Sequence, residues 1–278
     1  MSTANHSTTC RIDTTFSKLS ESSTPAFVAY VSAGDPTLEK CLAIIRSIAD
    51  AGADVIELGV PFSDPLADGA VNQLAADRAL KAGCTLAKVL DLISDFRTTH
   101  QTPIVLFTYL NPIFTYGYEK FVVDAKQAGA DGVLLLDLPP DEATLNKAFA
   151  DNHALKTITL IAPTSPTERI ESLAKQSQGF IYALSRTGVT GAQAAPSQSI
   201  GATVHAIKQH TDVPVCVGFG INTPDQAAMV ASVSDGVIVG SAIVNQIAEN
   251  ADKSPQELAA IIGAFVKPLI DATHGGKG

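Results

Sequence analysis

The sequence lacks the patterns that mark zinc-binding and nucleic-acid-binding proteins. Its four cysteines, Cys10, Cys41, Cys84 and Cys216, form no C-x-x-C pair and lie in no cluster of histidines. We therefore expect reduced thiols, no metal site and a cytoplasmic protein. The formal net charge is -9 and no run of basic residues occurs, which argues against nucleic acid as a main partner.

Long apolar runs are also missing. No stretch approaches the roughly 18 consecutive apolar residues that a membrane-spanning helix requires, and the polar N-terminus has no signal-peptide core. We therefore expect no membrane association. What the chain does contain is material for a large core, because 46% of its 278 residues are hydrophobic and only 17% are charged. This composition suits one large globular domain.

Short apolar runs alternate with helical patterns along the chain. Strands are predicted at 26–31, 54–58, 104–109, 132–136, 156–161, 180–184, 213–217 and 236–239. Helices are predicted at 38–51, 71–82, 86–98, 118–128, 141–152, 167–177, 199–210, 224–232 and 255–266. Such an alternation indicates an α/β protein with a parallel sheet that helices cover on the outside.

We predict that the eight strands close into a single-domain (β/α)8 TIM barrel over residues 21–278. An open doubly wound sheet is the alternative, and it fits less well because no G-x-G-x-x-G motif follows the first strand. The motif Ala-Gly-Ala-Asp precedes both the second and the fourth strand, at 51–54 and 128–131, which suggests an internal repeat. Residues 1–20 are expected to form an extension that is partly disordered or holds a short helix from residue 11 to 20.

The stretch from Glu57 to Gly69 is the most informative part of the sequence. Because side chains alternate along a strand, Glu57 shares one face of its strand with Val55. A carboxylate on a buried strand is costly unless it is paired or used in chemistry. One interpretation is an acid satisfied by backbone amides. The other is an acid/base pair with Asp68, which the following loop returns to the same strand end.

Three glycine-rich loops follow the last three predicted strands, at 187–191, 218–221 and 240–244. Glycine lets backbone amides approach an anion, and the N-terminus of a following helix adds partial positive charge. Barrels frequently bind phosphate after their seventh and eighth strands. Any one loop could be an ordinary tight turn, but together they predict a phosphate site without specifying a reaction.

Other polar residues carry weaker signals. Four lie at predicted strand ends, where such residues pack more often than they catalyse: Tyr30, Tyr109, Asp137 and Tyr182. Three histidines fall on or near predicted outer helices, where we expect them to be solvated: His153, His205 and His210.

Several motifs together carry a resemblance to a known family. The stretch from Glu57 to Gly69, with the sequence ELGVPFSDPLADG, is the most specific of them. The others are Gly34-Asp-Pro36, Tyr109-Leu-Asn-Pro112, Ser185-Arg-Thr-Gly-Val-Thr-Gly191, Gly218-Phe-Gly-Ile221 and Gly240-Ser-Ala-Ile-Val244. In their order along the chain, these motifs resemble those of the tryptophan synthase alpha subunit family, over about residues 20 to 268.

This resemblance implies a lyase that splits indole-3-glycerol phosphate into indole and glyceraldehyde 3-phosphate. Glu57 matches the general acid/base that protonates indole C3 and handles the side-chain hydroxyl proton. Asp68 matches the residue that accepts a hydrogen bond from the indole N–H and stabilises the cationic intermediate. A retro-aldol cleavage without metal or Schiff base requires such a proton donor and such an anion, so the resemblance agrees with the reading of Glu57 and Asp68 as a pair.

The resemblance also implies binding residues and a partner. The positions matched to phosphate binding are Gly191, Gly220, Gly240 and Ser241, and those matched to substrate binding are Tyr30, Tyr109, Tyr182 and Thr190. Among these, Tyr182 matches a tyrosine beneath the substrate, and Thr190 a loop threonine that orders Asp68. The family implies no metal, and it places pyridoxal phosphate only in a beta-subunit partner, in an expected alpha2beta2 complex.

The sequence departs from the family at a few positions. Ala70 replaces a usual proline, Val71-Asn72 replaces a usual Thr/Val-Ile pair, and Tyr30 stands where phenylalanine is frequent. Three alternatives stay open: a lyase that works without a beta subunit, another phosphate-sugar barrel enzyme such as an isomerase, and a non-catalytic subunit. The last would be expected to have lost one of the two acids, and both are present.

Overall fold

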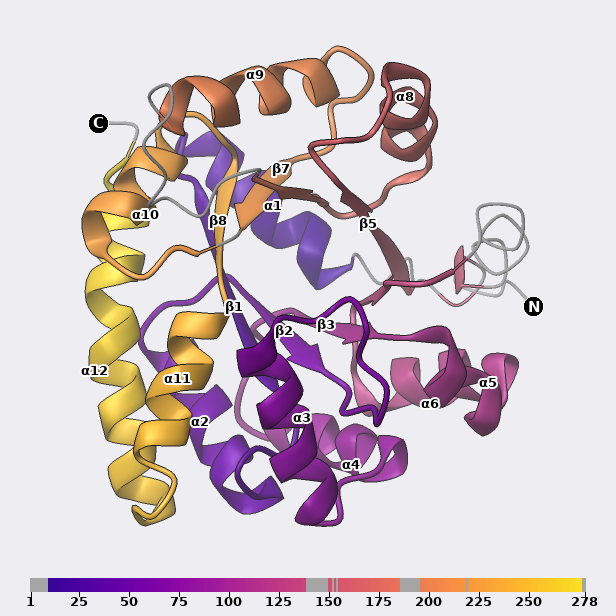
Figure 1. The fold of residues 1–278 in the computed structure, drawn as a ribbon, viewed down its shortest axis with the longest axis vertical. Helices are drawn as coiled ribbons and strands as arrows, with labels where there is room; N and C mark the ends of the chain where they lie inside the picture. Colours follow the sequence, from indigo (N-terminus) through magenta and orange to yellow (C-terminus); the bar gives the residue numbers. More distant parts are fainter. Residues whose placement is uncertain are drawn as a thin grey trace, which may run out of the picture.

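The eight predicted strands close into a barrel (Figure 1). The computed structural model describes residues 10–138, 150–151, 153, 155–185, 196–218 and 220–276. Every strand runs parallel to its neighbour in chain order, and β1 (Ala26–Ser32) pairs with β8 (Gly236–Val239) to complete the ring. The predicted TIM barrel is therefore confirmed, and the open doubly wound sheet is excluded.

The strand bounds agree with the prediction to within two residues. Between β1 and β8 the strands are β2 (Val55–Gly59), β3 (Ile104–Thr108), β4 (Gly132–Leu135), β5 (Lys156–Ile161), β6 (Ile181–Leu184) and β7 (Val215–Gly218). They are short and rich in β-branched residues, as expected for strands buried on both faces.

The helices lie outside the barrel, except for α1. They are α1 (Arg11–Glu21), α2 (Leu38–Asp50), α3 (Ala70–Lys81), α4 (Leu86–Arg97), α5 (Leu110–Tyr116), α6 (Tyr118–Ala128), α8 (Thr167–Gln176), α9 (Pro196–Lys208), α10 (Pro224–Ala231), α11 (Ser241–Glu249) and α12 (Pro255–His274). The short α5 is not among the predicted helices, and α11 begins within segment 240–244, where a loop is predicted. Most of the helix predicted at 141–152 lies outside the described residues.

Helix α12 is longer than predicted. The predicted helix ends at Val266. Pro268, two residues later, removes a backbone donor and clashes with the preceding turn, which disfavours a longer helix. The helix continues to His274 with Pro268 inside it. Buried side chains on both sides of the proline, Val266 and Leu269, pack in the core between the barrel and its helices, and this tertiary contact outweighs the local penalty.

The inner faces of the strands form a separate core that α1 closes from below. Ile12 and Phe16 of α1 belong to the same buried cluster as Val28 and Val55 of the strands. The Phe16 ring lies 5.6 Å from that of Phe180. The amino-terminal end of the barrel is thus filled with apolar side chains, so a ligand must enter at the carboxyl ends of the strands.

Asp131 fastens α1 to the barrel. Its carboxylate accepts hydrogen bonds from Arg11 and Arg97, both at 2.8 Å, and from the backbone N–H of Ile104 at 2.9 Å. Asp131 is almost completely buried, and such a charge requires this degree of pairing.

The repeated Ala-Gly-Ala-Asp motif has a structural explanation. Gly52 and Gly129 both have left-handed backbones, with φ of 105° and 99°, where a side chain would be strained. Asp54 and Asp131 then each accept a hydrogen bond from a backbone N–H at the start of the preceding strand, at 2.7 and 2.9 Å. Each copy of the motif turns the chain and ties two neighbouring strands together.

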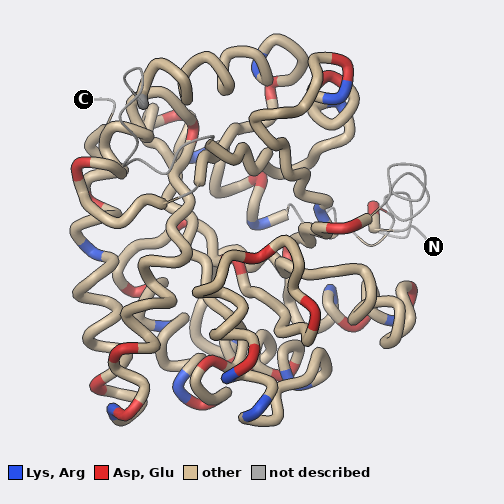
Figure 2. Tube along the Cα trace, in the orientation of Figure 1, with Lys and Arg blue, Asp and Glu red and all other residues tan. Residues whose placement is uncertain are grey.

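Charged residues are spread over the outside of the molecule. In the view of Figure 2, lysine and arginine positions are scattered along the helices and do not gather in one patch. All four cysteines are buried and unpaired. Within the described ranges, no helix is long and apolar enough to cross a membrane, and no group of three or more His, Cys, Asp or Glu residues could hold a metal ion.

Candidate active site

Glu57 is a buried carboxyl group without a partner. It lies on β2 between Tyr30 of β1 and Val105 of β3, and its side chain is 0% exposed. Neither carboxylate oxygen has a hydrogen-bond partner among the described residues. The interpretation that backbone amides satisfy this acid is therefore wrong. Burial raises the pKa of Glu57 to about 8, because no nearby donor or cation stabilises the charged form.

The other buried acids in the described part of the chain differ from Glu57. Asp35 accepts two hydrogen bonds from Arg78, both at 2.8 Å, and Asp131 has the two arginines described above. These pairings are what a structural carboxylate requires in a protein interior. Glu57 is the exception, and an unpaired buried acid with a raised pKa is a candidate for proton transfer.

Asp68 is held at the same end of the barrel. It lies in the loop between β2 and α3, where the hydroxyl of Tyr109 donates to its carboxylate at 2.8 Å. The same hydroxyl accepts from the backbone N–H of Ala67 at 3.0 Å. Burial raises the pKa of Asp68, whereas hydrogen bonds from Tyr109 and Asn72 oppose that rise. The two acids thus share burial, and Asp68 alone has donors that favour its ionised form.

Asn72 is a site residue that sequence reasoning missed. It was noted only as a departure from the family, yet its side chain acts on Asp68. The available signal was its position four residues after Asp68, since the first turn of α3 packs back toward the loop that precedes it.

Two tyrosines, the buried Tyr30 and the partly buried Tyr182, lie close enough to both acids to feel their charges. Burial raises the pKa values of Tyr30 and Tyr182, and the negative charges of Glu57 and Asp68 raise them further. The four side chains therefore act on one region of the barrel interior. The glycines on neighbouring strands leave the required space, since a Cβ on Gly59 would lie 2.4 Å from the Tyr30 hydroxyl.

The predicted phosphate loop at 240–244 lies beside this region. Gly240 precedes α11 and Ser241 is its first residue, so the unpaired backbone N–H groups of the first turn lie directly after β8. A Cβ on Gly240 would contact Tyr30 at 3.4 Å, which places this helix start next to the acids. Gly220 has a φ of +71°, which favours glycine. Thr190 and Gly191 lie outside the described residues.

The weaker candidates have structural roles or lie away from the acids. Asp137 accepts the backbone N–H of Leu110 at 2.6 Å, at the start of α5. His205 is exposed on α9, whereas His153 and His210 are half-buried. The prediction of solvated histidines thus holds fully only for His205.

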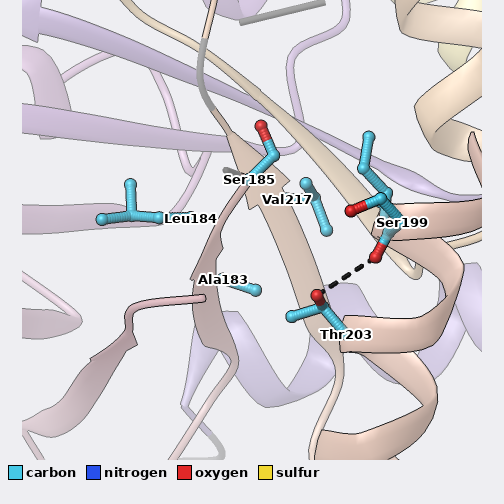
Figure 3. Close-up of a pocket in the computed structure, with 7 residues that line it drawn as sticks. Ala183, Leu184, Ser185, Ser199, Thr203 and Val217 are labelled. Atoms are coloured by element: carbon cyan, nitrogen blue, oxygen red, sulfur yellow. Dashed lines mark hydrogen bonds between the residues drawn. The ribbon is translucent and has the colours of Figure 1, made fainter. Parts of the chain in front are cut away.

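A small pocket lies on the outer side of the barrel, between the ends of β6 and β7 and helix α9 (Figure 3). Residues that line it are Ala183, Leu184, Ser185, Ser199, Thr203 and Val217. Thr203 donates to the carbonyl oxygen of Ser199 at 3.1 Å. Ala183 and Val217 belong to the core outside the barrel, so this pocket is separate from the interior that holds Glu57.

Comparisons with known proteins agree with this arrangement. The family model for the tryptophan synthase alpha chain matches residues 16–273. The chain is 50% identical to the tryptophan synthase alpha chain of Geobacter sulfurreducens over 94% of this chain and 98% of the relative. It is 51% identical to that of Geotalea daltonii, over 93% of this chain and 97% of the relative.

Solved structures give the same result. Tryptophan synthase subunit alpha from Legionella pneumophila matches with a TM-score of 0.86 and 38% identity, covering 95% of this chain and 98% of that one. A chain of Mycobacterium tuberculosis tryptophan synthase matches with a TM-score of 0.85 and 33% identity, over 95% and 98% of the two chains. The chain belongs to the tryptophan synthase alpha chain family.

Proposed function

We propose that this chain is the alpha subunit of tryptophan synthase and cleaves indole-3-glycerol phosphate to indole and glyceraldehyde 3-phosphate. The observation that carries the proposal is the fully buried, unpartnered Glu57 beside an Asp68 that Tyr109 holds in place. A buried acid without a hydrogen-bond partner lowers the stability of the fold, and it is suited to exchanging a proton with a bound substrate.

The reaction follows from the two acids. Protonated Glu57 gives its proton to C3 of the indole ring, and positive charge develops on the ring nitrogen. Asp68 accepts a hydrogen bond from the indole N–H and stabilises that charge. The Glu57 carboxylate then takes the proton of the hydroxyl on the adjacent carbon. As the carbon–carbon bond breaks, its electron pair returns to the ring, which releases indole and leaves an aldehyde.

The pKa of Glu57 suits both steps. A group with a pKa of about 8 is partly protonated near neutral pH, so it can act as an acid and then as a base within one turnover. Asp68 has to remain an anion throughout, and its hydrogen bonds from Tyr109 and Asn72 favour that form.

The phosphate of the substrate anchors the reacting bond above the acids. The N-terminus of α11, with Gly240 and Ser241, supplies backbone N–H groups on one side. The turn at Gly220 brings a second backbone segment close, and by family match Gly191 completes the phosphate site. Binding energy from this non-reacting group can be used to orient the indole against Glu57 and Asp68.

A beta subunit is the expected partner, in an alpha2beta2 complex whose pyridoxal phosphate belongs to the beta chain. Large apolar side chains are exposed on the loops and helices that follow β2 and β3. Leu66 is 92% exposed and Phe114 is 78% exposed. These two side chains flank the segments that hold Asp68 and Tyr109, on the face where the family match expects the partner to dock. A docked partner could therefore influence the position of Asp68.

The direct test is to supply indole-3-glycerol phosphate and measure indole release, with and without a beta subunit. Glu57→Gln should reduce turnover by at least roughly 10²–10⁴-fold, as is typical for loss of a general acid/base. Asp64→Asn, which changes an exposed acid of the neighbouring loop, is the matched control in the isolated chain. No indole from the wild type in either condition would refute the proposed reaction, and activity unaffected by the beta subunit would favour a stand-alone lyase.

A further inference from the structure

The loop between β2 and α3 carries Asp68 but has few contacts of its own to hold it in place. Over residues 62–70, all of which the structure describes, no residue is fully buried, and Leu66 is 92% exposed. Helix α3 begins without a side-chain cap, because its N-cap residue is Gly69. An acid on such a loop requires contacts from other segments to keep one position.

Gln73, in the first turn of α3, reaches back to this loop. Its side-chain Nε2 donates to the carbonyl oxygen of Asp68 at 2.8 Å and lies 3.5 Å from that of Pro65. Its backbone N–H donates to the carbonyl oxygen of Gly69 at 3.1 Å. The amide nitrogen carries two hydrogens and can serve both side-chain contacts, of which the shorter one, to Asp68, is the stronger.

These contacts close a turn around the main chain of Asp68. The backbone N–H of Asp68 donates to the carbonyl oxygen of Pro65 at 3.0 Å, and Gln73 approaches that same oxygen. Gln73 therefore bridges both ends of the turn from Pro65 to Asp68. Tyr109 holds the other part of the residue, its carboxylate, at 2.8 Å. The main chain and the side chain of Asp68 are thus fixed by two different residues, from α3 and from the end of β3.

We propose that Gln73 is a positioning residue for the cleavage, which holds the main chain of Asp68 so that its carboxylate meets the indole N–H. This inference rests on the proposed function. The hydrogen bond from Tyr109 fixes one carboxylate oxygen, about which the rest of the residue could still turn. An anchor on the main chain removes that freedom, and a displacement of about 1 Å at a reacting group can lower a rate by about 10²-fold.

The phosphate site provides an internal reference for this role, because it lies on another helix. Ala75 of α3 lies in a buried cluster with Val244 of α11, and Val71 packs against that cluster. Gln73 is exposed, so its amide is not part of this packing. Removing the amide should therefore leave α11 and its phosphate contacts in place.

The test is Gln73→Met, which keeps the length of the side chain and removes its donor. The value of kcat for indole release should fall by about tenfold, while the affinity for glycerol 3-phosphate should stay within about twofold of the wild type. Gln73→Lys, which places N–H donors at a similar reach, should restore kcat to within about threefold. An unchanged kcat in Gln73→Met, a loss that Gln73→Lys does not restore, or an equal loss of glycerol 3-phosphate binding would overturn the positioning role.

Gln209→Met is the matched control. Gln209 is also an exposed glutamine, it follows α9, and its side-chain nitrogen lies 3.2 Å from that of His205. The substitution therefore removes a comparable side-chain contact that does not involve the loop of Asp68, and kcat should not change. A tenfold loss in this control as well would show that the effect is not specific to Gln73.

A second measurement does not depend on turnover. Hydrogen exchange at the backbone N–H of Asp68 should be about fivefold faster in Gln73→Met, the factor expected for the loss of one hydrogen bond, and unchanged in Gln209→Met. Equal exchange rates in the wild type and Gln73→Met would overturn the role of Gln73, whatever the enzyme cleaves. Faster exchange in a protein that releases no indole would instead overturn the proposed function alone.

Discussion

Replacing Glu57 with glutamine should change how the stability of the protein depends on pH. Burial raises the pKa of this carboxyl group from 4.5 to about 8 in the folded state. Below the lower value the group is protonated in both states and has no effect. Between the two values the unfolded chain loses the proton and the folded protein keeps it, so stability falls as pH rises. Above the upper value the penalty is complete.

The size of the effect follows from the same two values. One pKa unit corresponds to about 1.4 kcal/mol, so the complete penalty is about 5 kcal/mol, and about 3 kcal/mol of it is present at neutral pH. Because Glu57 is fully buried, solvent screening does not reduce it. A domain of ordinary stability has only about 5–15 kcal/mol in total, so the change is well within reach of measurement.

Urea unfolding of the wild type and Glu57→Gln over a series of pH values provides the assay. The free energy of unfolding of the variant, relative to the wild type, should increase by about 1.4 kcal/mol per pH unit between about pH 5 and pH 7. The subtraction removes the contributions of all other titrating groups, and the buried amide adds only a constant. Asp64→Asn, at an exposed acid of the loop after β2, is the control variant. A flat or falling difference for Glu57→Gln would show that Glu57 is solvated or paired in solution.

Other predictions test the remaining parts of the site and the fold. Tyr109→Phe removes the hydroxyl that donates to Asp68, so kcat for indole release should fall by about tenfold; an unchanged kcat would contradict that role. Gly240→Val should raise the inhibition constant of inorganic phosphate, because the added side chain would hinder the approach of an anion to the start of α11; unaltered phosphate inhibition would remove Gly240 from the phosphate site. Asp131→Asn should lower the free energy of unfolding by about 3–5 kcal/mol in urea, since it leaves buried Arg97 without its anion, and should leave kcat unchanged.

The sequence predicts most of the barrel because two signals agree there. These are the spacing of the apolar residues and the positions of the residues that end helices and strands. Apolar strands are bounded by residues such as Gly52 and Gly129, whose left-handed backbones end helices, so the alternation can be read locally. The predicted end of α12 was wrong. Pro268 locally disfavours a helix, but the packing of buried side chains on both sides of it outweighs that preference. The short helix α5 was missed because Tyr109-Leu-Asn-Pro112 looks like a turn, although proline is tolerated in a first helical turn.

The candidate site was also predictable in part. Glu57 stood out because an acid on an apolar strand conflicts with its surroundings, and the structure retains that conflict. The hydrogen bond from Tyr109 to Asp68 was not predictable, since it depends on the path of a loop that has no period. The raised pKa of Glu57 has the same origin as its conflict with the surroundings, since burial alone accounts for it.

The first aspartate of the repeated Ala-Gly-Ala-Asp turn, Asp54, sets the strand register that orients Glu57. Asp54 precedes β2 by one residue and binds the backbone N–H of Phe27 at 2.7 Å, which fixes how far β2 can slide along β1. In that register Tyr30 lies opposite Glu57. A slip of one residue would turn Glu57 away from the barrel interior and toward the helices. A hydrogen bond at the closed end of the barrel therefore determines which way the acid points at the open end.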